Sequence, residues 1–507
     1  MAKKTKGIVA TTALITVLTL VFKLLGFVKQ AVVAYYFGTT LETDIYYVAL
    51  NFVGSLSSAF IRAITISLVS IYTHCLVQKG REASYKLISA CLEILVPIVL
   101  VVLLFAYMFT PQIASILAPS YSPDESTLLA SYLRICYPFF LFAVVTLVWN
   151  SLMDANKDFV VSRTESLITS LTTILCCVVL YNVQAVTSLV IAQYLSYIIF
   201  GSLLLIRGRR YFHFTLTRFR DVPEIRQVVM TALPLFIGNS VSQINKIVDN
   251  SVSTGLGYGN ASALSYATVL EEFVGYILVN NVVDVLYVNF ANYTAEGDFD
   301  KLKSTMKSAI NVMICIMVPI TIVACLTAEN IVTIAYFRGS FTTDSVAMTS
   351  AALIGYALGF TFEGIRDIIL RGLYSFKNTT GPMITGFFAV GANVFFTIVL
   401  ARYFGIFGVT IATTISYLVN FLINSQMLRR HIPDYRFLNH IPTVLKQLPS
   451  AALLIVVTLA FKHFFTNDII IFAGSAIIGI GLYYLVLIPM RVPEIGMLID
   501  KVKDRLA

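Results

Sequence analysis

Charged residues are scarce in this chain: lysine, arginine, aspartate and glutamate together make up 12% of its 507 residues. A soluble domain typically carries about 25% charged and about 45–50% apolar residues. Here 58% of the residues are hydrophobic and the mean hydropathy is +0.83. A soluble core of this length could not bury so much apolar surface. The composition therefore excludes a soluble enzyme and predicts an integral membrane protein.

Cysteine and histidine form no metal-binding or disulfide pattern in the sequence. No CxxC spacing occurs among the 7 cysteines, and nearly all of them lie inside apolar runs, where cysteine behaves as a small hydrophobe. The 5 histidines are scattered without ligand spacing. We therefore expect neither a disulfide framework nor a metal site, and no bound cofactor.

Sequence features of nucleotide and nucleic-acid chemistry are missing as well. No Walker A loop is present, which argues against ATP hydrolysis by this chain. The net charge of +9 comes from basic residues spread over short loops rather than gathered in one patch, so we expect no nucleic-acid partner. The loops are also too short for the catalytic acid or metal-binding constellation that a membrane-embedded glycosyltransferase usually needs. A transporter is the class that remains.

Long apolar runs recur along the chain, each near the ~20 residues that cross a bilayer as a helix. The first run follows Lys3, Lys4 and Lys6 and has no small-residue cleavage site, so we interpret it as a retained helix rather than a signal peptide. The runs predict an all-α integral membrane protein with about fourteen transmembrane helices. These are expected near residues 8–36, 43–72, 86–109, 127–150, 162–181, 186–206, 228–254, 262–291, 307–327, 346–370, 381–401, 405–427, 443–462 and 468–490.

The lysines and arginines of the loops indicate how these helices are oriented. The termini and alternate loops contain 27 of them, and the opposite loops contain 3. Because basic residues are retained on the cytosolic side of a membrane, both termini should be cytosolic. The expected location is a bacterial plasma membrane, crossed many times, with membrane lipids as neighbours.

A faint internal repeat suggests that the chain is built from two lobes. Phe52-Val53-Gly54 recurs as Phe273-Val274-Gly275, and Gly38 recurs as Gly259, at one offset of 221 residues. An even number of helices per half makes this a parallel repeat, and transporters built in this way bind substrate between the halves. We predict four parts: a first six-helix lobe, a basic cytosolic linker, a second six-helix lobe, and two further helices with a cytosolic tail, at residues 1–206, 207–227, 228–428 and 429–507.

Several charged residues lie at membrane depth, where each costs about 2.5–3.5 kcal/mol on insertion scales and indicates function by default. Lys23 is too deep in the first helix for easy snorkelling, whereas Lys29 is near the outer end, where snorkelling is an equally good explanation. In the seventh helix, Asn239, Gln243, Lys246 and Asn250 form one polar stripe, flanked by Asp249. We expect Lys23, Lys29 and Lys246 to line a cationic cavity between the lobes, suited to an anionic substrate.

The acidic residues of the second lobe have two interpretations. Glu363, Arg366, Asp367 and Arg371 can pair at spacings of three and four, which is as consistent with ion pairs that join helices as with substrate contact. Glu271 and Glu272 either face the lysines across the cavity or balance Lys246. We favour the cavity for Glu272.

Four short segments of the chain form a set of local motifs: LGFVKQ at 25–30, FG at 37–38 with TDIYYVA at 43–49, YFRGSFT at 336–342 and LYSFKNTTGP at 373–382. Together and in this order they resemble the MurJ-type lipid II flippases, within the larger superfamily of multidrug, oligosaccharidyl-lipid and polysaccharide exporters. The similarity runs over essentially the whole chain.

The resemblance implies a cavity that binds the diphosphate and sugars of an undecaprenyl-linked glycan, with the last two helices forming a groove for the lipid tail. Asp44, an acidic residue at membrane depth within the second of these segments, is also expected to contact the substrate, as are the lysines. The resemblance also implies a role in coupling a cation for Asp249, with sodium, protons or the membrane potential as the driving force. The family lines its cavity with arginines, and this chain differs there. Serine stands at the helix-two position (Ser57 or Ser58) and Val269 at the helix-eight position.

These observations predict a flippase that moves a polyprenyl-diphosphate-linked precursor outward by alternating access, with lipid II for peptidoglycan synthesis as the leading substrate. Cell-wall biogenesis and cell shape would then depend on it, and proteins of cell-wall synthesis are the expected partners. A flippase for a capsule or O-antigen unit and a cation-coupled multidrug exporter are the alternatives.

Overall fold

The chain is all-α in the computed structural model. The structure describes residues 21–490 apart from 157, 159, 160, 162, 216, 218–220, 377, 379, 433 and 434. Every regular element among those residues is a helix, and no strand occurs among them. The retained first helix predicted at 8–36 lies partly outside the described residues, and its described part is helical over 21–37.

Within the described part of the chain, nine helical stretches are long and apolar enough to cross a membrane. A tenth is added if α14 (Thr343–Ala357) and α15 (Phe360–Ser375), bent by 40° at their junction, count as one span. Many leucine and phenylalanine side chains on these helices are exposed, including Leu104 at 60% and Phe105 at 57%. Such exposed apolar side chains need lipid around them. The chain is therefore a multi-pass membrane protein, as predicted.

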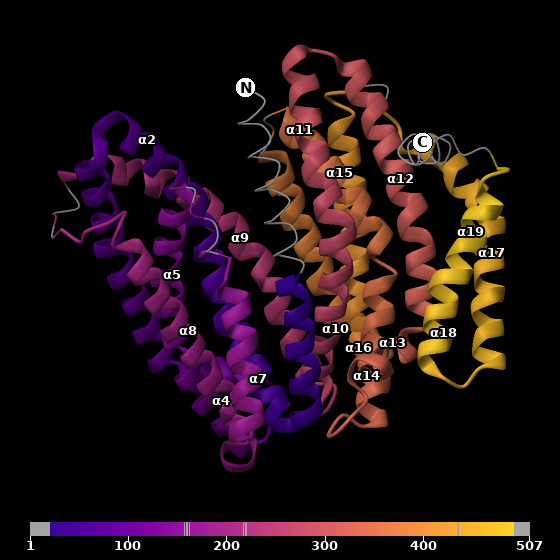
Figure 1. Cartoon of the computed structure of the whole chain (residues 1–507), viewed down its shortest axis with the longest axis horizontal. Coiled ribbons are helices and arrows are strands. Elements are labelled where there is room, and N and C mark those ends of the chain that lie inside the picture. Colours follow the sequence, from indigo (N-terminus) through magenta and orange to yellow (C-terminus); the bar gives the residue numbers. More distant parts are fainter. Residues whose placement is uncertain are drawn as a thin grey trace. The chain divides into compact units, whose positions relative to one another are not determined.

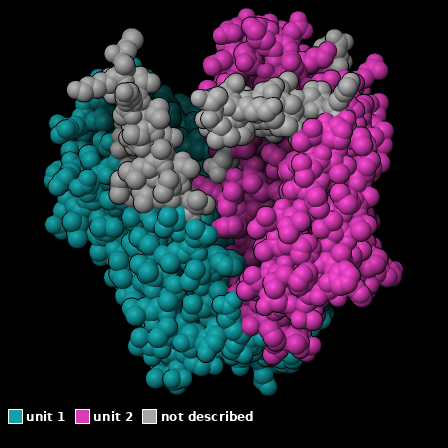
Figure 2. Space-filling model, turned by 45° about the vertical axis from the view of Figure 1, so that its right-hand side comes forward, with its two compact units in different colours: residues 1–262, 338–341 teal, residues 263–337, 342–507 magenta. Residues whose placement is uncertain are grey.

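Two compact units make up the chain, shown in different colours in Figure 2. Unit 1 contains residues 1–262 and the short segment 338–341, and unit 2 contains residues 263–337 and 342–507. These units are not the two six-helix lobes predicted from the repeat, and the division into those lobes stays a prediction.

Unit 1 is organised around α2 (Leu41–Met108), which turns back on itself at Gly80 (Figure 1). Gly80 has a φ of 84°, a left-handed conformation that glycine adopts without steric cost, and it breaks the helix there. Helices α5 (Pro138–Ala155) and α9 (Glu224–Thr254) pack along α2, and α7 (Glu165–Gln184) packs on α8 (Thr187–Gly208). Two shorter helices, α3 (Thr110–Leu117) and α4 (Pro123–Cys136), and the helical segment 21–37 also belong to the unit.

Part of the basic segment predicted as a linker packs into unit 1. Phe212 and Val222 are each only 6% exposed and belong to the same apolar cluster as Leu68 and Leu152. The backbone N–H of Thr215 also donates to the Ser89 hydroxyl at 3.1 Å. The described part of this segment is thus held against α2.

Unit 2 has its core where α12 (Phe299–Leu326), α15 and α16 (Thr380–Leu428) meet. Helix α17 (Ile441–Phe464) packs on α12 and on α19 (Ile480–Leu487), and Cys315, Leu454 and Tyr483 are buried where they touch. The remaining elements of the unit are α10 (Asn260–Gly275), whose first three residues belong to unit 1, and η2 (Tyr276–Asn280), α11 (Asn281–Glu296), α13 (Ala328–Tyr336), η3 (Phe437–His440), α18 (Asp468–Gly474) and η4 (Ser475–Gly479).

Candidate functional site

The polar stripe predicted on the seventh helix lies on α9 and is anchored to α2 at one end. Asn250 is 8% exposed, accepts a hydrogen bond from Asn51 Nδ2 at 3.1 Å, and donates to the Lys246 carbonyl at 2.7 Å. Lys246, one turn earlier, is exposed, whereas Asp249 is 7% exposed. The stripe therefore passes from a buried amide pair to an exposed cation within one turn of helix.

Lys23 and Lys29 lie on the helical segment 21–37, and both side chains are half-buried. The segment is tied to α2 by Gln30, whose Nε2 donates to the Tyr47 hydroxyl at 2.7 Å. Both lysines belong to unit 1, as do Lys246 and Asp249. One unit thus carries all three of the cations assigned to substrate.

Asp44 occupies a different kind of position from the lysines. It is fully buried, and its two carboxylate oxygens accept from the backbone N–H groups of Gly259 at 2.6 Å and Ser262 at 2.7 Å. Gly259 directly precedes α10 and Ser262 lies in its first turn, where a helix has unpaired donors and a partial positive charge. In this structure Asp44 caps α10, and the substrate contact expected of it stays a prediction.

Two of the sequence segments that carry the family resemblance meet in unit 1, although about 300 residues separate them. The backbone N–H of Ser340 donates to the Tyr35 carbonyl at 2.8 Å. Gly38 and Gly339 both have a positive φ, of 56° and 62°. A Cβ at Gly38 would overlap the Ser340 carbonyl, and one at Gly339 would overlap the Tyr35 carbonyl. Glycine is needed at both positions for this close approach.

The charged residues of α15 form ion pairs, but not at the spacings expected. Arg366 pairs with its neighbour Asp367 at 2.7 Å and lies 4.3 Å above the ring of Tyr417 on α16. Arg371 pairs with Asp284 of α11 at 2.8 Å. These contacts favour the interpretation in which the charges join helices within unit 2. Glu272 is exposed on α10 in that unit.

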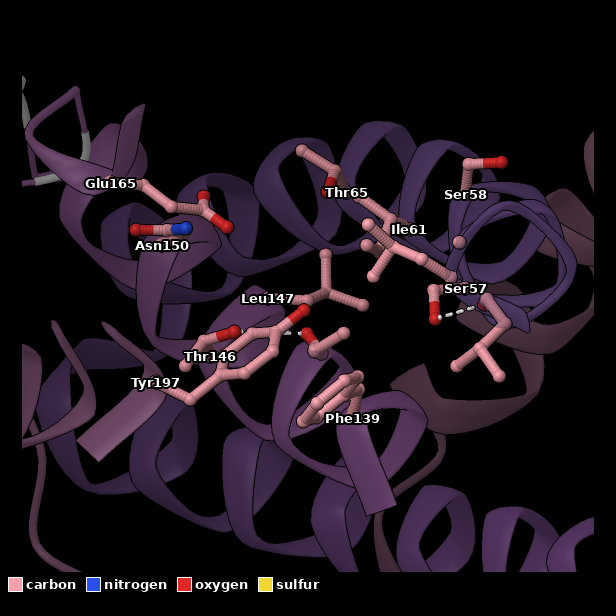
Figure 3. A pocket seen from close by; sticks show the side chains of 14 residues that line it. Ser57, Ser58, Ile61, Thr65, Phe139, Thr146, Leu147, Asn150, Glu165 and Tyr197 are labelled. Atoms are coloured by element: carbon pink, nitrogen blue, oxygen red, sulfur yellow. Dashed lines mark hydrogen bonds between the residues drawn. The ribbon is translucent and has the colours of Figure 1, made fainter. Parts of the chain in front are cut away.

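A cavity of about 230 Å³ lies inside unit 1, where α2, α5, α7 and α8 come together (Figure 3). The polar side chains in its wall include Ser57, Ser58, Thr146, Asn150, Glu165 and Tyr197. Leu50, Val53 and Leu147 provide apolar wall. Ser57 and Ser58 are the positions singled out in the sequence because arginine is expected there. Glu165 and Asn150 were not predicted as site residues.

Comparison with known proteins places the chain among transporters of one kind. The family model described as "Lipid II flippase MurJ" matches residues 33–478. A probable lipid II flippase MurJ of Thermotoga maritima is 23% identical over 404 residues, which cover 79% of this chain and 81% of that protein. One from Buchnera aphidicola subsp. Baizongia pistaciae is 22% identical over 422 residues, which cover 81% of each chain.

Solved structures show the same fold. A lipid II flippase MurJ in an inward closed conformation matches with a TM-score of 0.81 at 23% identity, over 94% of this chain and 98% of that one. An inward-facing multidrug transporter of the MATE family matches with a TM-score of 0.62 at 15% identity, over 82% of this chain and 96% of that one.

Proposed function

The chain belongs to the lipid II flippase MurJ family, and we propose that it carries lipid II from the cytosolic to the outer leaflet of a bacterial plasma membrane. The observation that carries this proposal is the match to the family model over residues 33–478, most of the chain. The curated relatives with this name are similar over about four-fifths of their own length. The protein is accordingly a transporter that serves peptidoglycan synthesis, not an enzyme.

The polar groups of unit 1 suit the physical problem that such a transporter solves. A diphosphate and its sugars cannot cross hydrocarbon unaided, because even one charge costs about 2.5–3.5 kcal/mol at the centre of a helix on insertion scales. Lys23, Lys29 and Lys246 supply ammonium groups that compensate phosphate charge. The amides of the α9 stripe supply hydrogen bonds for sugar hydroxyls. We propose that this site is exposed in turn to the two sides of the membrane by alternating access.

Fourteen spans are the count that we propose for this chain. The ten stretches counted above include α2 and α16 once each, and both helices are interrupted by a glycine with positive φ, Gly80 and Gly405. Dividing them at these glycines adds two spans. Helix α9 adds another, since its 31 residues can cross a bilayer although its polar stripe lowers its hydropathy. The helical segment 21–37 is counted as the fourteenth.

Cytosolic termini are the orientation that we propose. Within unit 1, Lys79 beside the Gly80 turn pairs with Glu224 at the start of α9, so two predicted cytosolic segments lie at one end. Ser120 donates to the Thr254 carbonyl at 3.0 Å, which joins two predicted external segments at the other end. Cysteine-accessibility labelling should find a cysteine at Ser122 from outside and one at Ser304 from inside. Labelling of both from one side would refute the orientation.

Asp249 is the group that we propose for coupling transport to a cation, to sodium or to protons. It is a buried carboxylate on the α9 helix, three residues from Lys246. Asp249→Asn should reduce transport while folded protein stays in the membrane. Unchanged transport, with the same dependence on sodium and on membrane potential, would rule the role out.

The function itself is tested by depleting the protein and identifying the lipid-linked intermediate that accumulates inside the cell. Accumulation of lipid II is expected. Serine at positions 57 and 58 and valine at 269, where the family resemblance implies arginine, favour one second candidate, a flippase for another polyprenyl-diphosphate-linked glycan. Accumulation of a capsule or O-antigen precursor with a normal lipid II level would identify that candidate. Partnership with cell-wall synthesis proteins stays a prediction.

A further inference from the structure

Three hydroxyls in the wall of the cavity in unit 1 use their protons on backbone carbonyls. The Ser57 hydroxyl donates to the Val53 carbonyl at 2.8 Å, and the Thr146 hydroxyl donates to the Phe142 carbonyl at 2.9 Å. Ser58 likewise donates to the Ser55 carbonyl at 3.1 Å. A hydroxyl has one proton to donate, so once it is used only the oxygen lone pairs are left for a guest.

Two stronger acceptors stand in the same wall. The Oδ1 atom of Asn150 is buried and accepts no hydrogen bond within the described structure. Glu165, on the first turn of α7, contributes a carboxylate at the exposed side of the cavity (Figure 3). Arg163 is the basic residue nearest to Glu165 along the described sequence. Its Nη2 atom lies 4.0 Å from Asp154 Oδ2 and forms an ion pair there. Leaving a buried acceptor such as Asn150 Oδ1 without a hydrogen bond costs free energy, so a ligand that donates a hydrogen bond would be favoured in this cavity.

The size and walls of the cavity indicate what kind of donor fits. About 230 Å³ is far more than a single ion needs, and apolar side chains such as Leu50 and Leu147 line the space beside the acceptors. The rings of Phe139 and Tyr197 lie 5.8 Å apart in the same wall, and aromatic rings attract organic cations. Acceptors, one carboxylate, aromatic rings and apolar wall together suit an ammonium group on a short aliphatic chain.

We propose that this cavity binds a primary ammonium group, with Glu165 and Asn150 as its acceptors and the aliphatic chain against Leu50, Val53 and Leu147. The ammonium can belong to a free aliphatic amine or to the transported precursor itself. The second of these sources rests on the proposed function, and the binding of a free amine does not.

The chain carries its own reporter for a binding measurement. Trp149 is the only tryptophan among the 507 residues and directly precedes Asn150. Purified full-length protein in lipid nanodiscs is titrated with n-pentylammonium chloride, and with n-pentanol as an uncharged probe of similar size, while the fluorescence of Trp149 is followed. Saturable binding of n-pentylammonium but not of n-pentanol is expected.

Substitutions then locate the site. Glu165→Gln should weaken n-pentylammonium binding about tenfold, since a hydrogen bond to a charged group is lost. Glu82→Gln is the matched control: its carboxylate is exposed in the same unit but does not line the cavity, so binding should not change. The double variant Glu165→Gln/Asn150→Asp returns the negative charge to the cavity and should restore binding. Asn150→Ala, which leaves Glu165 in place, should also weaken it.

Other outcomes overturn the proposal. If the original protein, Glu165→Gln and Asn150→Ala all bind n-pentylammonium equally well, the proposal is wrong. Competition by low-millimolar sodium chloride would assign the cavity to an inorganic cation instead.

A second arm identifies the source of the ammonium group. A purified lipid-linked precursor with a free primary amino group is compared with the same precursor after N-acetylation. If the group belongs to the precursor, acetylation and Glu165→Gln should weaken precursor binding by similar factors and not additively. If acetylation has no effect while n-pentylammonium binding depends on Glu165, the guest is a free amine. If no precursor binds, the proposed function fails while the amine titration still tests the cavity.

Discussion

Replacing Asp44 by asparagine removes the charge that caps α10. The carboxylate accepts from Gly259 N–H at 2.6 Å and from Ser262 N–H at 2.7 Å and is fully buried. Asparagine keeps one acceptor oxygen, but it presents an NH₂ group to the other backbone donor, so one charged hydrogen bond is lost. Such a bond contributes about 1.5–3 kcal/mol, and the charge at the helix N-terminus about 0.3–1 kcal/mol more.

These contributions amount to about 2–4 kcal/mol of local stability. Amide hydrogen exchange through local opening reports that free energy directly, and every 1.4 kcal/mol corresponds to about a tenfold change. Asp44→Asn should therefore accelerate exchange at Gly259–Ser262 about thirtyfold to several-hundredfold, measured by mass spectrometry on protein in nanodiscs. Exchange in distant helices such as α17 should be unaffected.

A carboxylate two residues earlier serves as the control. Glu42 lies in the same first turn of α2 but is exposed, so Glu42→Gln should leave exchange at Gly259–Ser262 as it is. If Asp44→Asn and Glu42→Gln exchange at the same rate there, the cap does not hold the start of α10 and the reasoning is wrong.

Three further predictions follow from other contacts. Gly339→Ala should lower the melting temperature in detergent by several degrees, because strain at a left-handed position costs about 1–3 kcal/mol. Gly386→Ala is the control, since a Cβ there meets open space and should leave the melting temperature unchanged. Equal melting temperatures of the two variants would refute the close approach. Lys23→Ala should weaken binding of a purified lipid-linked precursor about tenfold to hundredfold and Lys23→Arg should largely preserve it, whereas unchanged affinity of folded Lys23→Ala would exclude the contact. The hydrogen bond from Lys79 lowers the pKa of Glu224. The pair therefore stabilises the fold slightly at pH values above the ordinary carboxyl pKa, and this stabilisation is lost as the pH falls through the lowered pKa. The melting temperature of the original protein should lose this contribution on acidification, and that of Glu224→Gln should not.

The helices were predictable because hydropathy marks the part of each that lipid surrounds. Residues 162–181 were expected to be helical, and α7 covers Glu165–Gln184. The ends were less predictable. The span expected at 307–327 begins at Phe299 as α12, since backbone hydrogen bonds continue a helix into polar turns that hydropathy does not mark. A break between the helices expected at 43–72 and 86–109 was predicted, but both helices continue up to Gly80, where the left-handed backbone conformation interrupts them.

The site was less predictable than the helices, because its partners are far apart in sequence. Asp44 was predicted as a site residue because it is an acid at membrane depth. Its hydrogen-bond partner Gly259 lies 215 residues away, and no local pattern in the sequence indicates this pairing. Glu165 lies near the start of the helix expected at 162–181, where a charged residue at a span end is ordinary, so only the fold shows that it lines a cavity. The pairing of Arg366 with Asp367 was missed because spacings of three and four were considered and adjacent residues were not.

Unit 1 combines two kinds of charge that a single substrate could use together. Lys23, Lys29 and Lys246 suit phosphate, whereas the cavity around Glu165 and Asn150 suits an ammonium group. A lipid-linked precursor that carries both a diphosphate and an amino group would be complementary to both. On this view, there is a physical reason why serine rather than arginine stands at positions 57 and 58. An arginine in the wall of the cavity would form an ion pair with Glu165 and occupy the acceptors that the ammonium needs. The missing arginine then reflects which part of the substrate this unit recognises, and it is compatible with the same transported lipid.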